Sequence, residues 1–230
     1  MTPTPCIPDR WRRRLVAAGG AFAALAALPA LAVTSAPSAQ ALRLTPPTTE
    51  GPFYPDRLPA DRDADLARVA GRGGTAEGRL LYVAGRVLDA RGRPIPNAGI
   101  ELWQANARGR YIHSADTDAS GPLDPNFQGY GAAVTDAEGR YRFKTIKPAG
   151  YPLTQNSYRA PHIHFELTGR LDRHITQMWF PGEPLNSQDQ LFTVLSPRGQ
   201  QKVTCKLEGP TAGMEPDSQI ALWDIVIPNG

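Results

Sequence analysis

Cysteine is almost absent from this chain of 230 residues, which contains Cys6, Cys205 and no other. Cys6 lies in an N-terminal segment that we expect to be removed, so Cys205 would remain without a partner in the mature chain. An intrachain disulfide is therefore excluded as a means of holding the mature fold together. The residues on either side of Cys205 predict a buried small side chain rather than a nucleophile.

Long apolar runs are also missing, except near the N-terminus. Residues 15–33 are rich in alanine and leucine, follow four arginines and precede the small-x-small sequence Ala39-Gln40-Ala41. This order is typical of an export signal, and we expect cleavage after Ala41. A membrane anchor is the alternative, but the run is barely long enough to span a bilayer and contains glycine and proline. We therefore expect no stable membrane anchor after cleavage.

The arginines at positions 12–14 also resemble a twin-arginine signal. That route carries proteins that have already folded, which would suit an enzyme that acquires a metal before export. The expected location of the mature protein is periplasmic or secreted.

Net charge is the third feature that the mature chain lacks. Residues 1–41 carry a formal charge of +3, and the whole chain also carries +3. The remainder is therefore close to neutral, and the basic character belongs to the signal. Nothing in this distribution indicates a nucleic-acid-binding surface.

No long amphipathic helix is expected after residue 42. Short runs of valine, isoleucine and aromatic residues instead predict strands at 80–88, 99–103 and 140–146, with turns at 89–92 and 136–139. The fold class is mostly β, a single-domain antiparallel β-sandwich with long surface loops, whose core spans residues 80–230. Residues 42–79 are expected to form an N-terminal arm and loop. Within it, 56–79 is predicted to be a surface excursion with one helical turn at 64–69.

Two histidines give the first indication of chemistry. His162 and His164 lie in an apolar, β-branched stretch that predicts a strand. Residues two apart on a strand point to the same side, so both imidazoles would be offered to one metal ion. Taken alone, the pair is equally compatible with two partly buried histidines satisfied by backbone hydrogen bonds.

Four blocks in a fixed order carry a resemblance to a known family. They are Trp103-Gln104-Ala105-Asn106 with Gly109-Arg110-Tyr111, Leu123-Asp124-Pro125-Asn126-Phe127, Thr145-Ile146-Lys147-Pro148 with Tyr151-Pro152, and Arg159 with His162-Ile163-His164-Phe165. Together they resemble the intradiol ring-cleavage dioxygenases, over roughly residues 48–227. Within that family the similarity extends to the iron-binding subunit of the protocatechuate 3,4-dioxygenases.

The resemblance implies a non-haem Fe(III) held by Tyr111, Tyr151, His162 and His164. A hard ferric ion favours anionic oxygen donors, and imidazole completes such a ligand set. For either tyrosine alone, a packed aromatic would be the plainer interpretation. The implied reaction cleaves a catechol-type ring, protocatechuate or a related compound, with O2 to a cis,cis-muconate. Tyr151 would leave the metal and accept a substrate proton.

Further residues take roles from the same resemblance. Arg159 would stabilise negative charge that develops on the ring, because a guanidinium stays charged. The substrate pocket would include Gly51, Pro52, Tyr54 and Gln177. Family members that act on protocatechuate often have tryptophan where this chain has Leu153, so the site is expected to be roomier or less polar there.

Two other functions stay open at this point. A non-catalytic exported β-sandwich binding module would need no metal. A zinc hydrolase using His162 and His164 would need a third ligand, for which Glu166 is the near candidate. Tyr130, Tyr158, His113 and His174 lack the motif context and are interpreted as structural. The chain is expected to be an oligomer, and whether a second type of subunit is required stays open.

Overall fold

The computed structural model describes residues 41–117, 122–154, 156–169 and 173–228. These residues belong to one compact unit, Ala39–Gly230. Residues 1–40 of the predicted signal peptide, including Cys6, lie outside the described residues. Within the described part, no helix has both the length and the apolar character needed to cross a membrane.

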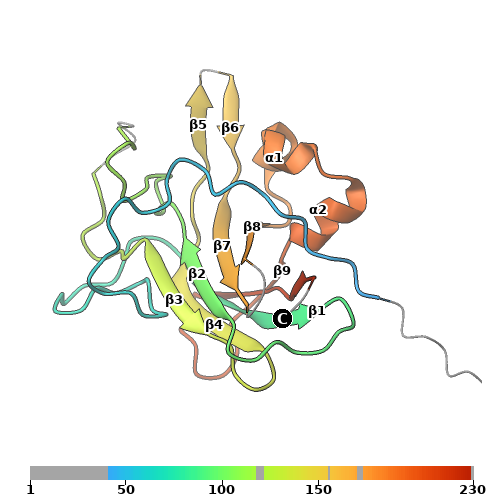
Figure 1. Cartoon of the computed structure of the whole chain (residues 1–230). Helices are drawn as coiled ribbons and strands as arrows, with labels where there is room; N and C mark the ends of the chain where they lie inside the picture. The colour runs from blue at the N-terminus through green and yellow to red at the C-terminus, as the bar shows by residue number, and fades with distance from the viewer. Residues whose placement is uncertain (1–40, 118–121, 155, 170–172, 229–230) are drawn as a thin grey trace, which may run out of the picture. The chain divides into compact units, whose positions relative to one another are not determined.

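A four-stranded antiparallel sheet carries the predicted histidines (Figure 1). Its strands lie in the order β3 (Tyr130–Val134), β2 (Gly99–Trp103), β7 (His162–Thr168) and β8 (Arg173–Trp179). The register places Trp103 opposite His164, and His164 opposite Gln177. The strand predicted at 99–103 has the expected bounds.

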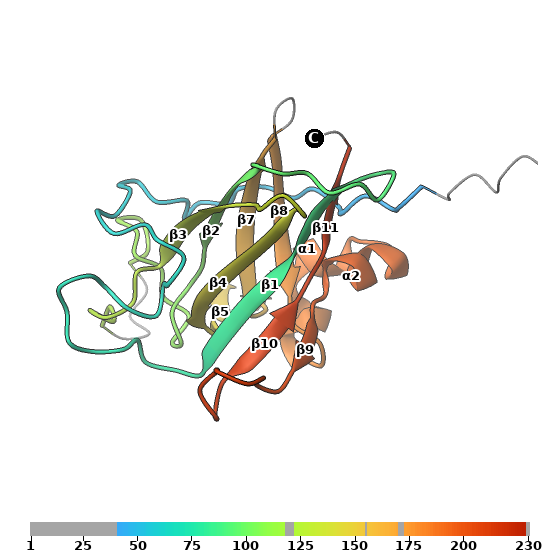
Figure 2. The ribbon, with the colours of Figure 1, turned by 90° about the horizontal axis from the view of Figure 1, so that it is seen from below.

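A second sheet is built around β1 (Leu80–Asp89), the long central strand in Figure 2. It pairs antiparallel with β4 (Arg140–Ile146) and parallel with β10 (Gln219–Leu222) and β11 (Ile225–Ile227). The short β9 (Lys206–Glu208) completes the sheet on β10. The antiparallel prediction therefore holds for the first sheet, whereas β1 also has parallel partners. Parallel partners come from distant chain segments, so local patterns do not reveal them.

Both sheets contribute to one hydrophobic cluster. Strand β1 supplies Leu81 and Val83, β4 supplies Phe143, and β7 supplies Ile163 and Phe165. Side chains alternate along a strand, so the intervening residues of β7 point to the opposite face. Packing of Ile163 and Phe165 in the core therefore fixes the direction in which His162 and His164 point.

The remaining elements are short. Strands β5 (Tyr151–Thr154) and β6 (Ser157–Arg159) form the two-stranded hairpin at the top of Figure 1. A 3₁₀ helix, η1 (Pro184–Gln188), precedes α1 (Gln190–Thr193) and α2 (Pro197–Val203). Helix α2 begins after Ser196, whose hydroxyl accepts a hydrogen bond from Gly199 N. Within the described residues, helices are therefore as short as expected.

The arm before β1 differs from its prediction. The helical turn predicted at 64–69 is wrong, because Asp65 forms a β-bridge with Lys144 instead. Leu66 N donates to Lys144 O, and Lys144 N donates to Ala64 O. Leu66 and Ala67 are fully buried, so this part of residues 56–79 belongs to the core and is not a surface excursion. Pairing with β4 outweighs the weak local helical preference.

Cys205 lies in the core, as predicted. Burial in apolar surroundings raises the pKa of its thiol to about 12. The thiolate is the reactive form of cysteine, so this side chain is suited to packing rather than to nucleophilic attack.

Candidate metal centre

Two nitrogen atoms and one oxygen atom lie close together on the face of β7 that points away from the hydrophobic cluster. The two Nε2 atoms of His162 and His164 lie 3.1 Å apart. The hydroxyl of Tyr111 lies 3.3 Å from His162 Nε2 and 3.2 Å from His164 Nε2. The centre of a triangle with these sides lies about 1.8 Å from each atom, so a point about 1 Å out of its plane lies about 2.1 Å from all three. Bonds of ~2.0–2.2 Å are usual for metals bound by imidazole or oxygen.

Tyr151 is the fourth residue at this centre. Its ring meets the ring of Tyr111 edge-on at 5.6 Å between centroids and lies 5.9 Å from the His162 ring. The structure thus brings the four predicted ligands together from β5, β7 and the segment after β2.

A tight turn explains how Tyr111 reaches the centre. Gly109 has a φ of 82°, in the left-handed region that favours glycine. A Cβ at this position would lie 2.7 Å from Gly150 O and 3.1 Å from Tyr151 Cβ. The turn therefore packs directly against the start of β5. Asp116 Oδ2 then accepts a hydrogen bond of 2.6 Å from Tyr111 N, which fixes the backbone of the predicted ligand.

The backbone sets the tautomer of His162. Its Nδ1 lies 2.6 Å from Ala160 O. A carbonyl oxygen can accept but not donate, so Nδ1 carries the proton and the Nε2 lone pair is left facing the centre. His164 is held differently, because its ring stacks on the indole of Trp103 at 4.9 Å and 14°.

Electrostatics favour uncharged side chains at this site when no cation is bound. Burial lowers the pKa of both imidazoles well below the usual value, with the charge of Arg159 adding to the effect at His162. Burial also raises the pKa of Tyr111 and of Tyr151, while the charge of Arg159 opposes the increase. Neutral imidazoles are ready to bind a metal, and buried phenols give up their protons to a strong cation. Two phenol oxygens with two imidazole nitrogens are chemically suited to Fe(III).

Arg159 is buried beside this group and held by two partners. Its Nε donates to Asp189 Oδ2 at 3.0 Å, and its guanidinium donates to Gln177 Oε1 at 2.5 Å. Asp189 is fully buried and also accepts from Ala160 N at 3.0 Å. Since Ala160 O binds His162, one carboxylate holds both the guanidinium and the residue whose carbonyl binds the imidazole.

The predicted pocket residues fall into two groups. Gln177 Nε2 donates to Thr48 Oγ1 at 2.9 Å and so ties Arg159 to the segment that leads to Gly51. Gly51 has a φ of 80°, and a Cβ there would lie 3.4 Å from His164 Cε1. Gln177 and Gly51 therefore lie at the predicted centre, whereas Pro52 is exposed.

Tyr54 contacts the residue that stacks on one of the predicted ligands. Its hydroxyl donates to Glu101 Oε2 at 2.7 Å, and its ring meets Trp103 edge-on at 5.1 Å. Trp103 in turn stacks on His164. Burial and the neighbouring Glu101 raise the pKa of Tyr54. Tyr54 thus supports the indole that stacks on His164.

Three residues near the centre were given no role from the sequence. Phe53 stacks on Tyr111 at 4.8 Å, Trp103 stacks on His164, and Asp189 holds Arg159. Trp103 lies in a motif block and Phe53 follows a predicted pocket residue, so both could have been found by position. Asp189 Oδ1 caps α1 by accepting from Leu191 N. Its sequence signature is therefore that of an ordinary helix cap.

Glu166, the expected third ligand of the zinc alternative, is engaged by another residue. Both oxygens of Glu166 accept hydrogen bonds from Arg173, at 2.5 and 2.7 Å. Within the described residues, no group of three or more histidine, cysteine, aspartate or glutamate side chains could hold a metal ion. A hydrolytic zinc site is therefore not favoured.

The chain is similar in sequence to known dioxygenases. Residues 49–228 match the model of a family described as dioxygenase. The chain is 51% identical over 134 residues to the beta chain of protocatechuate 3,4-dioxygenase from Burkholderia cepacia, covering 56% of this chain and 57% of that protein. It is 33% identical over 159 residues to catechol 1,2-dioxygenase from Acinetobacter baylyi, covering 63% of this chain and 49% of that protein. The matched part spans about half the length of these curated relatives.

Solved structures of dioxygenases are also similar to this chain. The dioxygenase domain of a dioxygenase carbohydrate-binding protein fusion from Streptomyces sp. SirexAA-E has a TM-score of 0.59 and 25% identity, covering 82% of this chain and all of that one. Catechol 1,2-dioxygenase from Acinetobacter sp. ADP1 has a TM-score of 0.61 and 25% identity, covering 80% of this chain and 63% of that one.

Proposed function

Since the chain belongs to the intradiol ring-cleavage dioxygenase family, we propose that it cleaves a catechol-type ring with O2 between the two hydroxylated carbons, giving a cis,cis-muconate. The observation that carries the proposal is the convergence of Tyr111, His162 and His164 within 3.3 Å of one another, with Tyr151 beside them.

Tyr111, Tyr151, His162 and His164 are the proposed ligands of a non-haem Fe(III). When bound there, the ferric ion would supply an electron-accepting centre for the hydroxyl oxygens of a catechol. Neutral imidazoles and buried phenols are the donor set that such an ion requires. The convergence of these donor atoms supports the assignment.

Tyr151 is the proposed acceptor of a substrate proton. It lies at the start of a hairpin whose next residues, Pro152 to Thr154, are exposed, whereas Tyr111 is clamped through its backbone by Asp116. Tyr151 is thus the phenol with more freedom to move away and pick up a proton as substrate binds. Arg159, oriented by Asp189 and Gln177, balances negative charge on the substrate ring.

Catechol, protocatechuate and hydroxyquinol are the candidate substrates, because relatives with these names match the chain. All three share the pair of neighbouring hydroxyls that the proposed centre would bind. Leu153, which is 52% exposed on the hairpin, offers no charge for a substrate carboxylate. We also propose an oligomer, since one relative is named as a beta chain. Light scattering would give its mass.

Export is a separate part of the proposal. Residues 1–41 would act as a signal peptide, followed by the arm at 42–79 and a β-sandwich catalytic core at 80–230. N-terminal sequencing of protein recovered from the periplasm and the medium should give a chain that begins at Leu42. Intact chain retained in the cytoplasm would contradict this part alone.

Oxygen uptake by the iron-loaded mature protein, measured against a panel of catechols, tests the activity. Tyr111→Phe and His162→Ala should abolish uptake together with the red-brown colour expected of tyrosine bound to ferric iron. Uptake that survives in both variants would overturn the proposal. A colourless protein containing zinc would point to a hydrolase instead, and one without metal to a binding module.

A further inference from the structure

The two histidines of the metal centre differ in how the protein holds their rings. His162 Nδ1 lies 2.6 Å from Ala160 O, so a backbone hydrogen bond fixes the orientation of that imidazole. His164 Nδ1 is buried and has no hydrogen-bond partner among the described residues. A metal-bound histidine usually donates its second ring N–H to an oxygen acceptor, which orients the ring. The orientation of His164 must therefore depend on something other than a hydrogen bond at Nδ1.

Trp103 packs flat against the imidazole of His164. The ring centroids lie 4.9 Å apart, and the ring planes are inclined by 14°. The two residues are also directly opposite each other in the pairing of β2 with β7, and Trp103 is 1% exposed. Tyr54 contacts the indole edge-on at a centroid distance of 5.1 Å, so the indole is itself held in place. Stacking on this buried indole therefore restricts rotation of the His164 ring.

The indole N–H has no part in this contact. Trp103 Nε1 is buried and has no hydrogen-bond partner in the part of the chain that the structure describes. A buried indole usually finds such a partner, as Trp223 does by donating from Nε1 to Lys202 O at 2.8 Å. The feature of Trp103 that serves the centre is therefore its aromatic face. A phenylalanine ring could supply such a face, whereas an aliphatic side chain could not.

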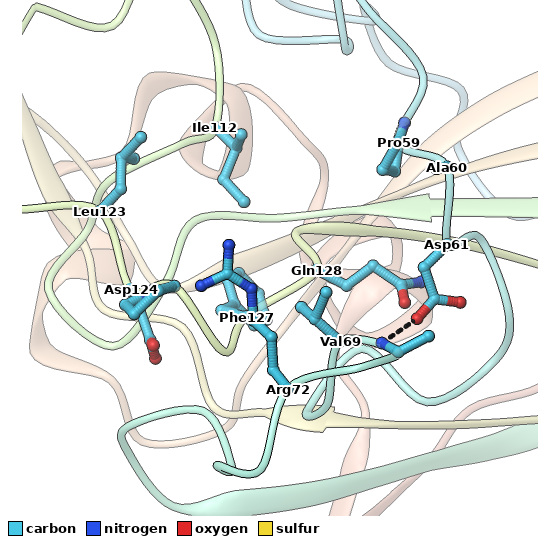
Figure 3. Close-up of a pocket in the computed structure, with 12 residues that line it drawn as sticks. Pro59, Ala60, Asp61, Val69, Arg72, Ile112, Leu123, Asp124, Phe127 and Gln128 are labelled. Atoms are coloured by element: carbon cyan, nitrogen blue, oxygen red, sulfur yellow. Dashed lines mark hydrogen bonds between the residues drawn. The ribbon is translucent and has the colours of Figure 1, made fainter.

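Trp103 borders a cavity as well as the imidazole. It lines a space of about 40 Å³. Pro59, Ile112 and Gln128 line the same space, and all three also line the larger cavity of about 540 Å³ shown in Figure 3. Ile112 is 43% exposed, so water can reach the larger cavity. A smaller side chain at position 103 would leave space beside His164 that adjoins these cavities. Water could enter this space, since His164 Nδ1 offers it a hydrogen-bond partner.

We propose that Trp103 is a positioning residue of the metal centre, whose stacked indole directs His164 Nε2 towards the metal position and keeps water away from the ring. This inference rests on the proposed Fe(III) centre. Without the indole, the imidazole can rotate, and Nε2 no longer stays within 3.2 Å of His162 Nε2 and of the Tyr111 hydroxyl. The aromatic face is required for this role, and the N–H is not.

Two substitutions at position 103 separate the ring from the N–H. Trp103→Leu removes the ring and should weaken Fe(III) binding at least about tenfold, a loss that is usual when a group that orients a metal ligand is removed. Trp103→Phe keeps an aromatic face and should bind Fe(III) with an affinity close to that of the wild type. Competition with a strong chelator measures the affinities, and the red-brown absorption reports tyrosine bound to the metal. Wild-type affinity in Trp103→Leu, or equal losses in the two variants, would overturn the proposal.

Trp223→Leu is the matched control for the loss of a buried indole. Trp223 is 5% exposed, and its ring contacts Phe165, whose side chain points to the face of β7 opposite to His164. This variant should unfold at a lower urea concentration than the wild type but retain its Fe(III) affinity. Equal losses of affinity in Trp223→Leu and Trp103→Leu would overturn the specific role of Trp103. If circular dichroism shows that Trp103→Leu does not fold, Trp103→Met, which also lacks a ring, takes its place.

Failure of this inference is distinguishable from failure of the proposed function. A wild-type protein that binds Fe(III) through tyrosine but takes up no oxygen with any catechol would overturn the activity alone. Unchanged affinity and colour in Trp103→Leu, beside an active wild type, would overturn the role of Trp103 alone. A wild-type protein that binds no Fe(III) would overturn both.

Discussion

Tyr151 and Arg159 face each other as a cross-strand pair at the base of the β5–β6 hairpin. Both side chains are buried, while the strand between Tyr151 and the tip is exposed. A register shift interrupts the pairing between Pro152 and Thr154. The hairpin thus brings a predicted metal ligand close to the guanidinium of Arg159. Asp189 accepts hydrogen bonds from that guanidinium and from Ala160 N, which follows the hairpin.

Replacing Asp189 with Asn should impair catalysis by releasing Arg159. The buried carboxylate accepts from Arg159 Nε, Ala160 N and Trp179 Nε1, and an amide cannot balance the guanidinium charge. Loss of an orienting partner of this kind typically costs ~10–100-fold in activity. Steady-state oxygen uptake should show the decrease mainly in kcat. Asp217→Asn, at an exposed position, is the control, and an equal effect in both variants would contradict the role of Asp189.

Gly109→Ala should destabilise the protein more than Gly182→Ala. Both glycines have positive φ, 82° and 72°, so both substitutions incur a backbone cost of roughly 1–2 kcal/mol. A Cβ at Gly109 would also lie 2.7 Å from Gly150 O, whereas at Gly182 it would meet nothing within 4 Å. Urea unfolding of the two variants measures the difference. Equal losses would show that the turn can relax away from β5.

The strands were predictable where the pattern is local. Residues 99–103 and 140–146 alternate in polarity and form strands with the predicted bounds. The parallel pairing of β1 with β10 and β11 depends on residues more than 130 positions away, so no local pattern reports it. Leu66 was missed for the same reason, because its burial depends on pairing with β4.

The candidate site likewise contains residues that a local pattern predicts and residues that it does not. The spacing of His162 and His164 predicts a shared face from strand geometry alone. Tyr111 and Tyr151 took their roles from the family resemblance, since a single tyrosine has no spacing that marks it as a ligand. Asp189 has the local signature of a helix cap, and its contact with Arg159 exists only in the folded chain.

Acid should remove a contribution of Glu215 to stability. Hydrogen bonds from Lys144 and Tyr82 lower the pKa of this carboxyl to about 2, below the value of about 4.5 from which it is shifted. The stabilisation is therefore present above pH 4.5 and is lost as the pH falls towards 2. Because the side chain is partly exposed, we expect the effect to be below about 1 kcal/mol. Urea unfolding of Glu215→Gln should depend less on pH in this window, and Glu138→Gln is the exposed control.

Removal of iron should lower the melting temperature of the wild-type protein but not that of His162→Ala. A ligand that binds the folded state alone stabilises it by about 2.7 kcal/mol at a free concentration one hundred times its Kd. Calorimetry with and without a strong iron chelator measures this contribution. His162→Ala lacks one of the proposed iron ligands, so it should hold little iron that the chelator could remove. Leu153→Ala, at an exposed hairpin position, should respond to the chelator as the wild type does. Equal shifts in the wild type and His162→Ala would mean that the metal binds elsewhere, and the assignment of His162 as a ligand would fail.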